Sequence, residues 1–97
     1  MLEVRQTELF SQWLHGLRDE RAQARIAERL LRMQGGNFGD VKSVGGGVSE
    51  LRINYGPGYR AYFVRRGPVV VVLLCGGDKR TQSTDIKRAK RMARDLE

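Results

Sequence analysis

The chain has 97 residues, of which 40% are apolar and 30% charged, a composition that predicts one folded domain over residues 1–97 with a single modest core. Lysines and arginines outnumber acidic residues by 18 to 11, and the net charge of +7 favours a polyanionic partner such as nucleic acid, a ribosome or an acidic protein. The alternative is a solvated basic surface that serves only solubility.

Two residue types that often carry chemistry are almost absent. Cys75 is the only cysteine and His15 the only histidine, which excludes an intrachain disulfide and the usual zinc and Cys–His catalytic arrangements. Cys75 ends an apolar run, so we expect it to be a core residue. That run is too short to cross a bilayer, and no signal-peptide pattern precedes it. We therefore expect a cytoplasmic protein without a metal or cofactor.

The first half of the chain predicts two helices. Residues 2–5 fit a short strand, and Thr7 is a good N-cap for the helix that follows. A second helix is expected over residues 21–34, ended by Gly35 and Gly36. Two helices joined so closely predict an αα-hairpin. Their apolar stripes are Phe10, Trp13, Leu14 and Leu17 in the first helix, and Ala22, Ile26, Leu30 and Met33 in the second.

The second half predicts strands and one further helix. Residues 37–47 are rich in glycine, and we expect a flexible connection with Lys42 exposed at its centre. From Val48 apolar and polar residues alternate, which predicts two strands around Gly56-Pro57-Gly58. A third, wholly apolar strand follows, so an antiparallel meander of three strands is the simplest arrangement. Ser83 or Thr84 is expected to cap a basic last helix that ends near Leu96, and the fold class is α+β.

The register of the hairpin decides which of its side chains meet. A three-residue turn pairs Arg52 with Tyr62 and Asn54 with Arg60, and places Glu50, Arg52, Arg60 and Tyr62 on one face of the sheet. Two arginines so close repel each other unless an anion lies between them. That anion is Glu50, an aspartate elsewhere in the chain, or a phosphate from outside.

Further cations follow the apolar strand. Lys79 and Arg80 come directly after Gly76-Gly77, where the backbone can approach a ligand closely, although the motif is not a Walker loop. A pocket of this kind suits RNA cleavage by in-line attack of a 2′-hydroxyl, which needs a held phosphate, a neutralised charge, a base and an acid. Arginine and lysine serve the first two needs. The candidates for proton transfer are Glu50, Tyr59, Tyr62 or a lysine.

Three segments, "GNFGDVK", "ELRINYGPGYR" and "LLCGGDKRTQ", in this order and spacing, resemble the RelE/HigB superfamily of toxins from toxin–antitoxin modules. The resemblance is strongest to the branch of phage-derived Gp49-like or addiction-module killer proteins, and covers nearly the whole chain. It implies a RelE-like fold, in which the helical hairpin packs on one face of a small curved antiparallel sheet and the other face receives mRNA in the ribosome.

The resemblance also implies roles and partners. It implies a cognate antitoxin, often a helix-turn-helix protein encoded next door, which blocks the toxin and carries it to operator DNA. Arg60 would hold the scissile phosphate while Arg52 and Lys79 neutralise charge. The residues expected to bind ribosomal RNA are Lys42, Arg80, Lys87, Arg88 and Arg91.

The chain departs from the family pattern at one point. Several RelE-type toxins carry a tyrosine or histidine near the C-terminus for proton transfer, and this chain has neither after residue 75. A base must then come from a lysine, Glu50 or a hairpin tyrosine. Two other functions remain open: a ParE-like poison of DNA gyrase, and a module that binds RNA or antitoxin without catalysis.

Overall fold

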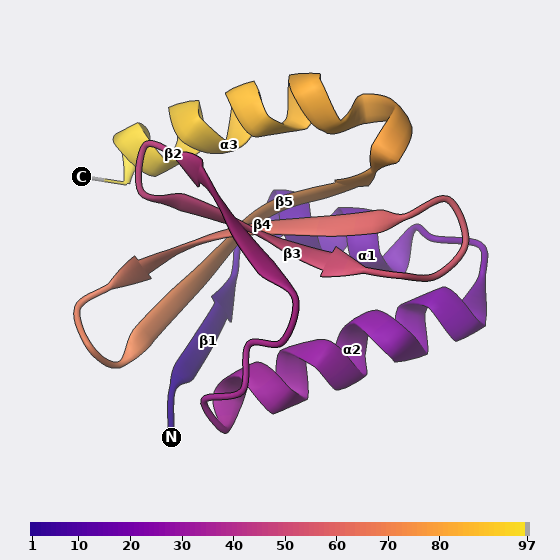
Figure 1. Cartoon of the computed structure of the whole chain (residues 1–97), viewed down its shortest axis with the longest axis horizontal. Coiled ribbons are helices and arrows are strands. Elements are labelled where there is room, and N and C mark those ends of the chain that lie inside the picture. The colour runs from indigo at the N-terminus through magenta and orange to yellow at the C-terminus, as the bar shows by residue number, and fades with distance from the viewer. Residues whose placement is uncertain (97) are drawn as a thin grey trace.

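The structure is a computed structural model and describes residues 1–96 of the chain (Figure 1). It has a mixed α+β fold with one five-stranded sheet and three α-helices, which confirms the predicted class. No helix in the described part of the chain is long and apolar enough to cross a membrane. The elements are β1 (Glu3–Gln6), α1 (Glu8–His15), α2 (Glu20–Gln34), β2 (Val41–Gly45), β3 (Val48–Ile53), β4 (Tyr59–Arg66), β5 (Val70–Asp78), a 3₁₀ turn (Lys79–Thr81) and α3 (Gln82–Asp95).

The sheet is larger than the predicted meander. Its strand order is β1-β5-β4-β3-β2, and β1 runs parallel to β5 while the other neighbours are antiparallel. The expectation of an antiparallel sheet is therefore wrong at this edge. The reason is that α1 and α2 separate β1 from the other strands in the chain, so β1 need not pair through a hairpin.

The second edge strand, β2, falls within the segment expected to be a flexible connection. Val41 and Val44 are half-buried against the two cores, and positive φ angles occur at Gly39, before the strand, and at Gly45, Gly46 and Gly47, at its end. Gly46 and Gly47 thus form the turn between β2 and β3, and residues 41–45 are free to pair as a strand. Lys42 is exposed as expected, although on a strand.

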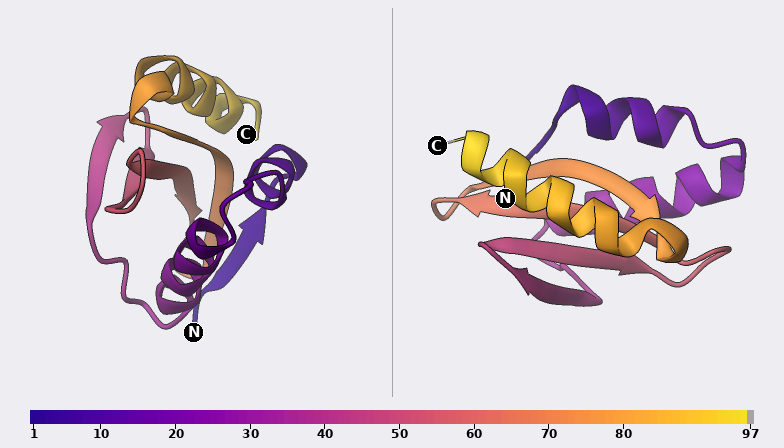
Figure 2. Two further views of the ribbon diagram at one scale, coloured as in Figure 1. Left: turned by 90° about the vertical axis from the view of Figure 1, so that its right-hand side faces the viewer. Right: turned by 90° about the horizontal axis from the view of Figure 1, so that it is seen from above.

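Helices cover both faces of the sheet (Figure 2). The larger core joins α1 and α2 to one face, and the predicted stripe of α2 is buried there. The smaller core joins Ala89 and Ala93 of α3 to Tyr62, Val64 and Leu74 on the other face. The inner strand β5 is covered on both sides, which explains its unbroken apolar run.

Local signals account for most helix ends. The Thr7 hydroxyl accepts a hydrogen bond from the Phe10 amide, as predicted. The amides of Gly36 and Asn37 bond to Met33 and Arg32, so α2 ends in a Schellman motif.

Two helix boundaries differ from the prediction. The helix α1 stops at His15, before Leu17, although Leu17 still packs on the larger core. The last helix is entered through a 3₁₀ turn that Asp78 caps, and neither Ser83 nor Thr84 is its cap. The carboxylate of Asp78 accepts from the Arg80 amide at 2.9 Å, which satisfies an amide that a later cap would leave unpaired.

Candidate functional site

A polar pocket of about 220 Å³ opens at the end of the β3–β4 hairpin. It brings together Arg52, Arg60 and Lys79, which the sequence had placed on three separate segments. Lys79 belongs to the 3₁₀ turn after β5, and this turn brings it beside the hairpin. The complete lining is Asp40, Arg52, Ile53, Asn54, Gly58, Arg60 and Lys79.

In the β3–β4 hairpin, the pairing partner of each β3 residue lies two residues away from the predicted partner. Arg52 lies opposite Arg60, and Glu50 lies opposite Tyr62. The connection is longer than three residues because the Gly58 amide closes a turn onto the Tyr55 carbonyl at 3.1 Å. Shifting the partner by two residues keeps every side chain on its face. The predicted grouping of these four residues on one face is therefore confirmed.

Arg60 is the most buried cation of the pocket. Its side chain is 10% exposed, and one terminal nitrogen donates to the Gly58 carbonyl at 2.7 Å. Its Nε lies 3.7 Å from Glu50 Oε2, within ion-pair range but too far for a hydrogen bond. In residues 1–96 neither Arg60 Nε nor Glu50 Oε1 has a hydrogen-bond partner, although both are buried. The buried Nε lies beside Glu50, so the donors that Arg60 can present to the pocket are on its terminal nitrogens.

Glu50 is the buried counter-charge of Arg60. Its Oε2 accepts from the Tyr62 hydroxyl at 3.1 Å and from Gln82 Nε2 at 2.9 Å. A buried carboxylate is tolerated only when it is paired and hydrogen-bonded in this way. Because Glu50 lies behind Arg60 and does not line the pocket, we interpret it as a residue that positions the guanidinium.

The two tyrosines considered for proton transfer lie away from the pocket. Tyr62 is fully buried beneath α3, and burial, followed by the charge of Glu50, raises its pKa above the ordinary value. Tyr59 points to the opposite face, where its ring lies 6.2 Å from that of Trp13, and its pKa is raised mainly by burial. Glu50 and Tyr62, which the sequence offered as groups that act on a substrate, are both buried and do not line the pocket.

Buried ionisable groups predict a loss of stability in alkali. Burial raises the pKa of the Cys75 thiol from 9.0 to about 11, and that of Tyr62 also rises. The folded state then keeps protons that the unfolded chain releases, so their stabilisation is present below the unfolded pKa and is lost as pH increases. We expect the urea midpoint to fall above about pH 9, and Cys75→Ala to delay that onset to about pH 10, where tyrosine begins to ionise in the unfolded chain. If the urea midpoint of Cys75→Ala depends on pH in the same way as that of the wild type, ionisation of the Cys75 thiol is not the cause of the loss.

Arg52 has a different counter-charge. Its terminal nitrogen lies 3.1 Å from Asp40 Oδ1, and the pair is largely exposed. An exposed ion pair contributes only about 0–1 kcal/mol, so a phosphate can replace Asp40 as the partner of Arg52 at little cost. Each arginine thus has its own carboxylate, and both internal anions considered from the sequence are present.

Lys79 is the most available cation in the pocket. It is exposed and makes no ion pair within the described chain. Gly58 lies against it: a Cβ there would come within 3.0 Å of Arg60 Nη1 and 3.7 Å of Lys79 Cβ. The glycine has a φ of +82° and lets the loop pass closely between the two cations.

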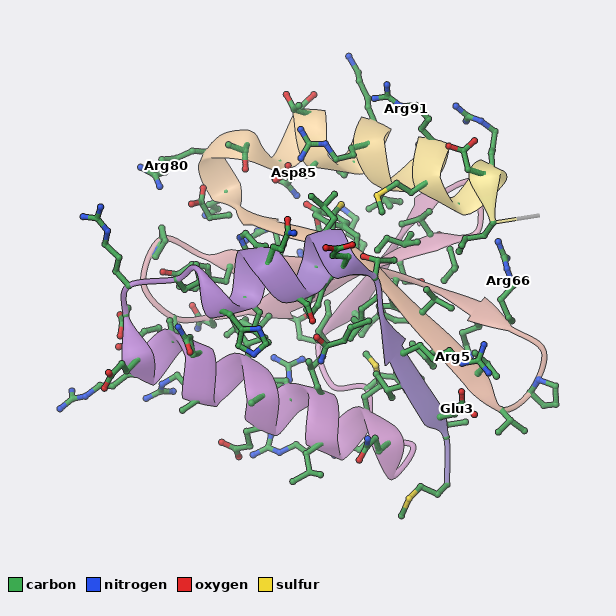
Figure 3. The ribbon with its side chains drawn as sticks, turned by 180° about the vertical axis from the view of Figure 1, so that it is seen from behind. Glu3, Arg5, Arg66, Arg80, Asp85 and Arg91 are labelled. Atoms are coloured by element: carbon green, nitrogen blue, oxygen red, sulfur yellow. The ribbon has the colours of Figure 1, made fainter. Side chains whose placement is uncertain are left out.

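The other predicted RNA-binding residues lie outside the pocket. Arg80 is ion-paired with Asp78 at 2.9 Å, and its hydrogen bond holds the pKa of that carboxyl below its usual range. Figure 3 shows Arg80 in the turn that precedes α3 and Arg91 farther along the helix. These side chains form an exposed basic surface separate from the pocket, comprising Arg80, Lys87, Arg88 and Arg91, with Lys42 exposed on β2.

The glycine pair after the apolar strand has a packing role. A Cβ on Gly76 would run into the Trp13 ring, and one on Gly77 would run into the carboxylate of Asp85. Asp85 is buried and accepts from the Thr81 hydroxyl at 2.5 Å. The expectation that these glycines admit a ligand is therefore wrong: they admit α1 and α3, one on each face of β5.

Gly76→Ala is expected to lower the free energy of unfolding by about 2 kcal/mol, because overpacking a core typically costs about 1–3 kcal/mol. Urea denaturation followed by circular dichroism measures the loss. In a Trp13→Leu background the added methyl group has room, so the same substitution should cost less. An equal cost in both backgrounds would show that contact with Trp13 is not the cause.

Two features of the site were missed from the sequence. Asp40 lines the pocket, but it lies just before β2, a strand hidden by the neighbouring glycines. The signal that could have found it is the pair Val41 and Val44, which favours an edge strand directly after Asp40. The second feature is the burial of Glu50, because the alternation of apolar and polar residues predicted that its side chain lies on an open face of the sheet. Among residues 1–96, no group of three or more His, Cys, Asp or Glu side chains is placed to hold a metal ion.

Comparison with known proteins gives two matches that bear on identity. The family model described as "Phage derived protein Gp49-like (DUF891)" matches residues 12–96. A protein of Haemophilus influenzae, described only as an uncharacterized protein, is 50% identical over 95 residues, covering 98% of this chain and 96% of that protein. No solved structure matches significantly.

Proposed function

Since the chain belongs to the family of phage-derived Gp49-like proteins, we propose that it is the toxin of a type II toxin–antitoxin module and cleaves mRNA on the ribosome. The proposal includes membership of the RelE/HigB superfamily and a RelE-like arrangement of the fold. The observation that carries it is the pocket in which Arg52, Arg60 and Lys79 converge from three segments of the chain.

The pocket matches the needs of in-line attack by a 2′-hydroxyl on the adjacent phosphate. Arg60, held by Glu50 and by the Gly58 carbonyl, would bind the scissile phosphate with its terminal nitrogens. Arg52 and Lys79 would neutralise the charge that grows on the phosphoryl oxygens. Ribosomal RNA would be held by the exposed cations Lys42, Arg80, Lys87, Arg88 and Arg91.

Proton transfer falls to a smaller set of groups than the sequence allowed. Arginine stays protonated, so Asp40 and Lys79 are the two side chains of the pocket lining that can exchange a proton with substrate. The proposal assigns the base and the acid to this pair. A phosphate that displaces Asp40 from Arg52 would also free that carboxylate to act.

The proposed partners are an antitoxin, mRNA and the ribosome. The antitoxin, a helix-turn-helix protein encoded beside this chain, would block the pocket and carry the toxin to operator DNA. The net charge of +7 supports partners that are polyanions.

Expression of the chain alone tests the proposal. We expect growth arrest, with new 5′ ends in cellular transcripts that fall at fixed positions within codons. A ParE-like poison of DNA gyrase would instead give broken DNA and no new RNA ends, and a module without catalysis would give neither. Growth arrest with intact transcripts would overturn the proposal.

A further inference from the structure

A second cavity of about 220 Å³ adjoins the pocket on the side of α2. The two cavities share Ile53 and Asn54, at the point where β3 ends. The two cavities therefore adjoin at the end of β3, with Lys79 in one lining and α2 in the other. The second cavity, here called the α2 groove, is lined by Arg25, Glu28, Arg29, Arg32, Ile53 and Asn54.

The spacing of its arginines puts them on one side of the helix. Arg25, Arg29 and Arg32 occur at i, i+4 and i+7, so they form a single row beside the buried stripe of α2. Glu28 is the one acidic residue of the lining, and it pairs with Arg32 at 2.5 Å. Both side chains of that pair are more than half exposed, so the pair is weak and Arg32 can turn to another anion.

Arg29 contributes a positive charge that no carboxylate within residues 1–96 neutralises. Its terminal nitrogens donate to the backbone carbonyls of Arg52, at 2.7 Å, and of Phe38, at 3.3 Å. These contacts fix α2 against β3, but carbonyl groups are neutral and leave the full charge of the guanidinium in the groove. An anion lying there would meet a prearranged positive potential.

Arg25 adds a flat surface for stacking. Its guanidinium lies over the Tyr55 ring, 4.6 Å from the centroid. An arginine held in this way keeps its charge and presents a planar face, and unstacked bases of single-stranded RNA bind to such faces. From Arg25 to Arg32 the helix advances about 10 Å at ~1.5 Å per residue. That is the length of about three stacked nucleotides at ~3.4 Å each.

We infer that the α2 groove binds the nucleotides flanking the one whose phosphate occupies the pocket, so that the protein holds a continuous segment of single-stranded RNA. The inference rests on the proposed function and adds the path of the substrate. RNA is favoured over an acidic peptide because the groove continues a phosphate-sized cationic pocket and combines charge with a stacking surface.

Binding of labelled 2′-O-methyl RNA, which cannot undergo attack by its own 2′-hydroxyl, tests the path. The oligonucleotides have three, six and nine residues, and fluorescence anisotropy is measured between 50 and 200 mM salt. We expect wild-type affinity to rise from three to six nucleotides and then level off. Arg25→Gln/Arg32→Gln should abolish that rise and reduce the salt slope by about 1.4, since each phosphate contact contributes ~0.7 for single strands.

A matched control removes the same charge elsewhere. Arg5 and Arg94 are exposed and line neither cavity, so Arg5→Gln/Arg94→Gln should retain the rise in affinity. If the two double variants bind RNA with equal affinity and salt dependence, the inference that RNA lies in the α2 groove is overturned. The proposed function still stands in that case if transcripts are cut in cells. Competition by polyglutamate that matches RNA of equal charge would also overturn it, in favour of an acidic protein partner. Absence of both RNA binding and transcript cuts removes the proposed function and the groove together.

Discussion

Arg60→Ala is expected to abolish growth arrest, because it removes the guanidinium that would hold the scissile phosphate. Loss of one group that stabilises transition-state charge typically costs about 10²–10³ in rate. The substitution should also lower the free energy of unfolding by roughly 3 kcal/mol, since Glu50 would lose the buried counter-charge at 3.7 Å. Growth after induction and urea denaturation of the purified chain measure the two effects.

The stability cost calls for a control that separates folding from function. Glu50→Gln keeps an acceptor for the Tyr62 hydroxyl and removes the buried negative charge. Arg60→Ala/Glu50→Gln should therefore regain part of the lost stability and still fail to arrest growth. A folded double variant with full toxicity would refute the assignment of Arg60.

A conservative change probes the geometry of the same contact. Lysine supplies a charge but not the planar fork of arginine, so Arg60→Lys should keep most of the stability and little of the activity. This outcome would locate the requirement in the arrangement of donors rather than in charge alone.

Much of the fold is encoded in local patterns of the sequence. The apolar stripe of α2, the Thr7 cap and the two-sided burial of β5 each follow from a periodicity or a single capping residue, and the structure confirms them. The faces of the β3–β4 hairpin could also be predicted, because alternation fixes the face even when the pairing shifts by two residues.

The remaining features depend on contacts between distant segments. The pairing of β1 with β5 joins strands separated by two helices, and no local signal specifies it. The burial of Glu50 depends on where α3 lies, since Gln82 reaches it across 32 positions of sequence. From the sequence, the sheet face that carries Arg60 and Glu50 was expected to be open. In the structure, α3 covers Glu50 and Tyr62 on this face. The end of the face with Arg52, Arg60 and Lys79 stays accessible.

Because α3 covers only part of this sheet face, the buried and the exposed residues of the site have different roles. The buried half of the face, Glu50 with Tyr62 and Gln82, holds one guanidinium in place, and the open half presents cations to solvent. A charge fixed from behind does not have to be reorganised when a phosphate arrives, and such preorganisation is the main source of electrostatic catalysis. Under the proposed function, Glu50 and Tyr62 would thus act through Arg60, whereas Tyr59 lies on the opposite face of the sheet.

Lys79→Ala is expected to reduce toxicity strongly while leaving stability unchanged. Lys79 lines the pocket, is exposed and has no ion pair in residues 1–96, so its removal should change the free energy of unfolding by less than about 0.5 kcal/mol. If it neutralises transition-state charge or exchanges a proton there, cleavage should slow by about 10²-fold or more.

The neighbouring residue provides a matched control for this prediction. Arg80 carries the same charge one position later, but it lies outside the pocket and is paired with Asp78. Arg80→Ala should therefore unfold at nearly the wild-type urea concentration and keep most of the toxicity. Rates of transcript cutting after induction compare the two variants directly. Equal losses would mean that Lys79 acts only as one charge of a diffuse basic surface, and the pocket would then have no special role for it.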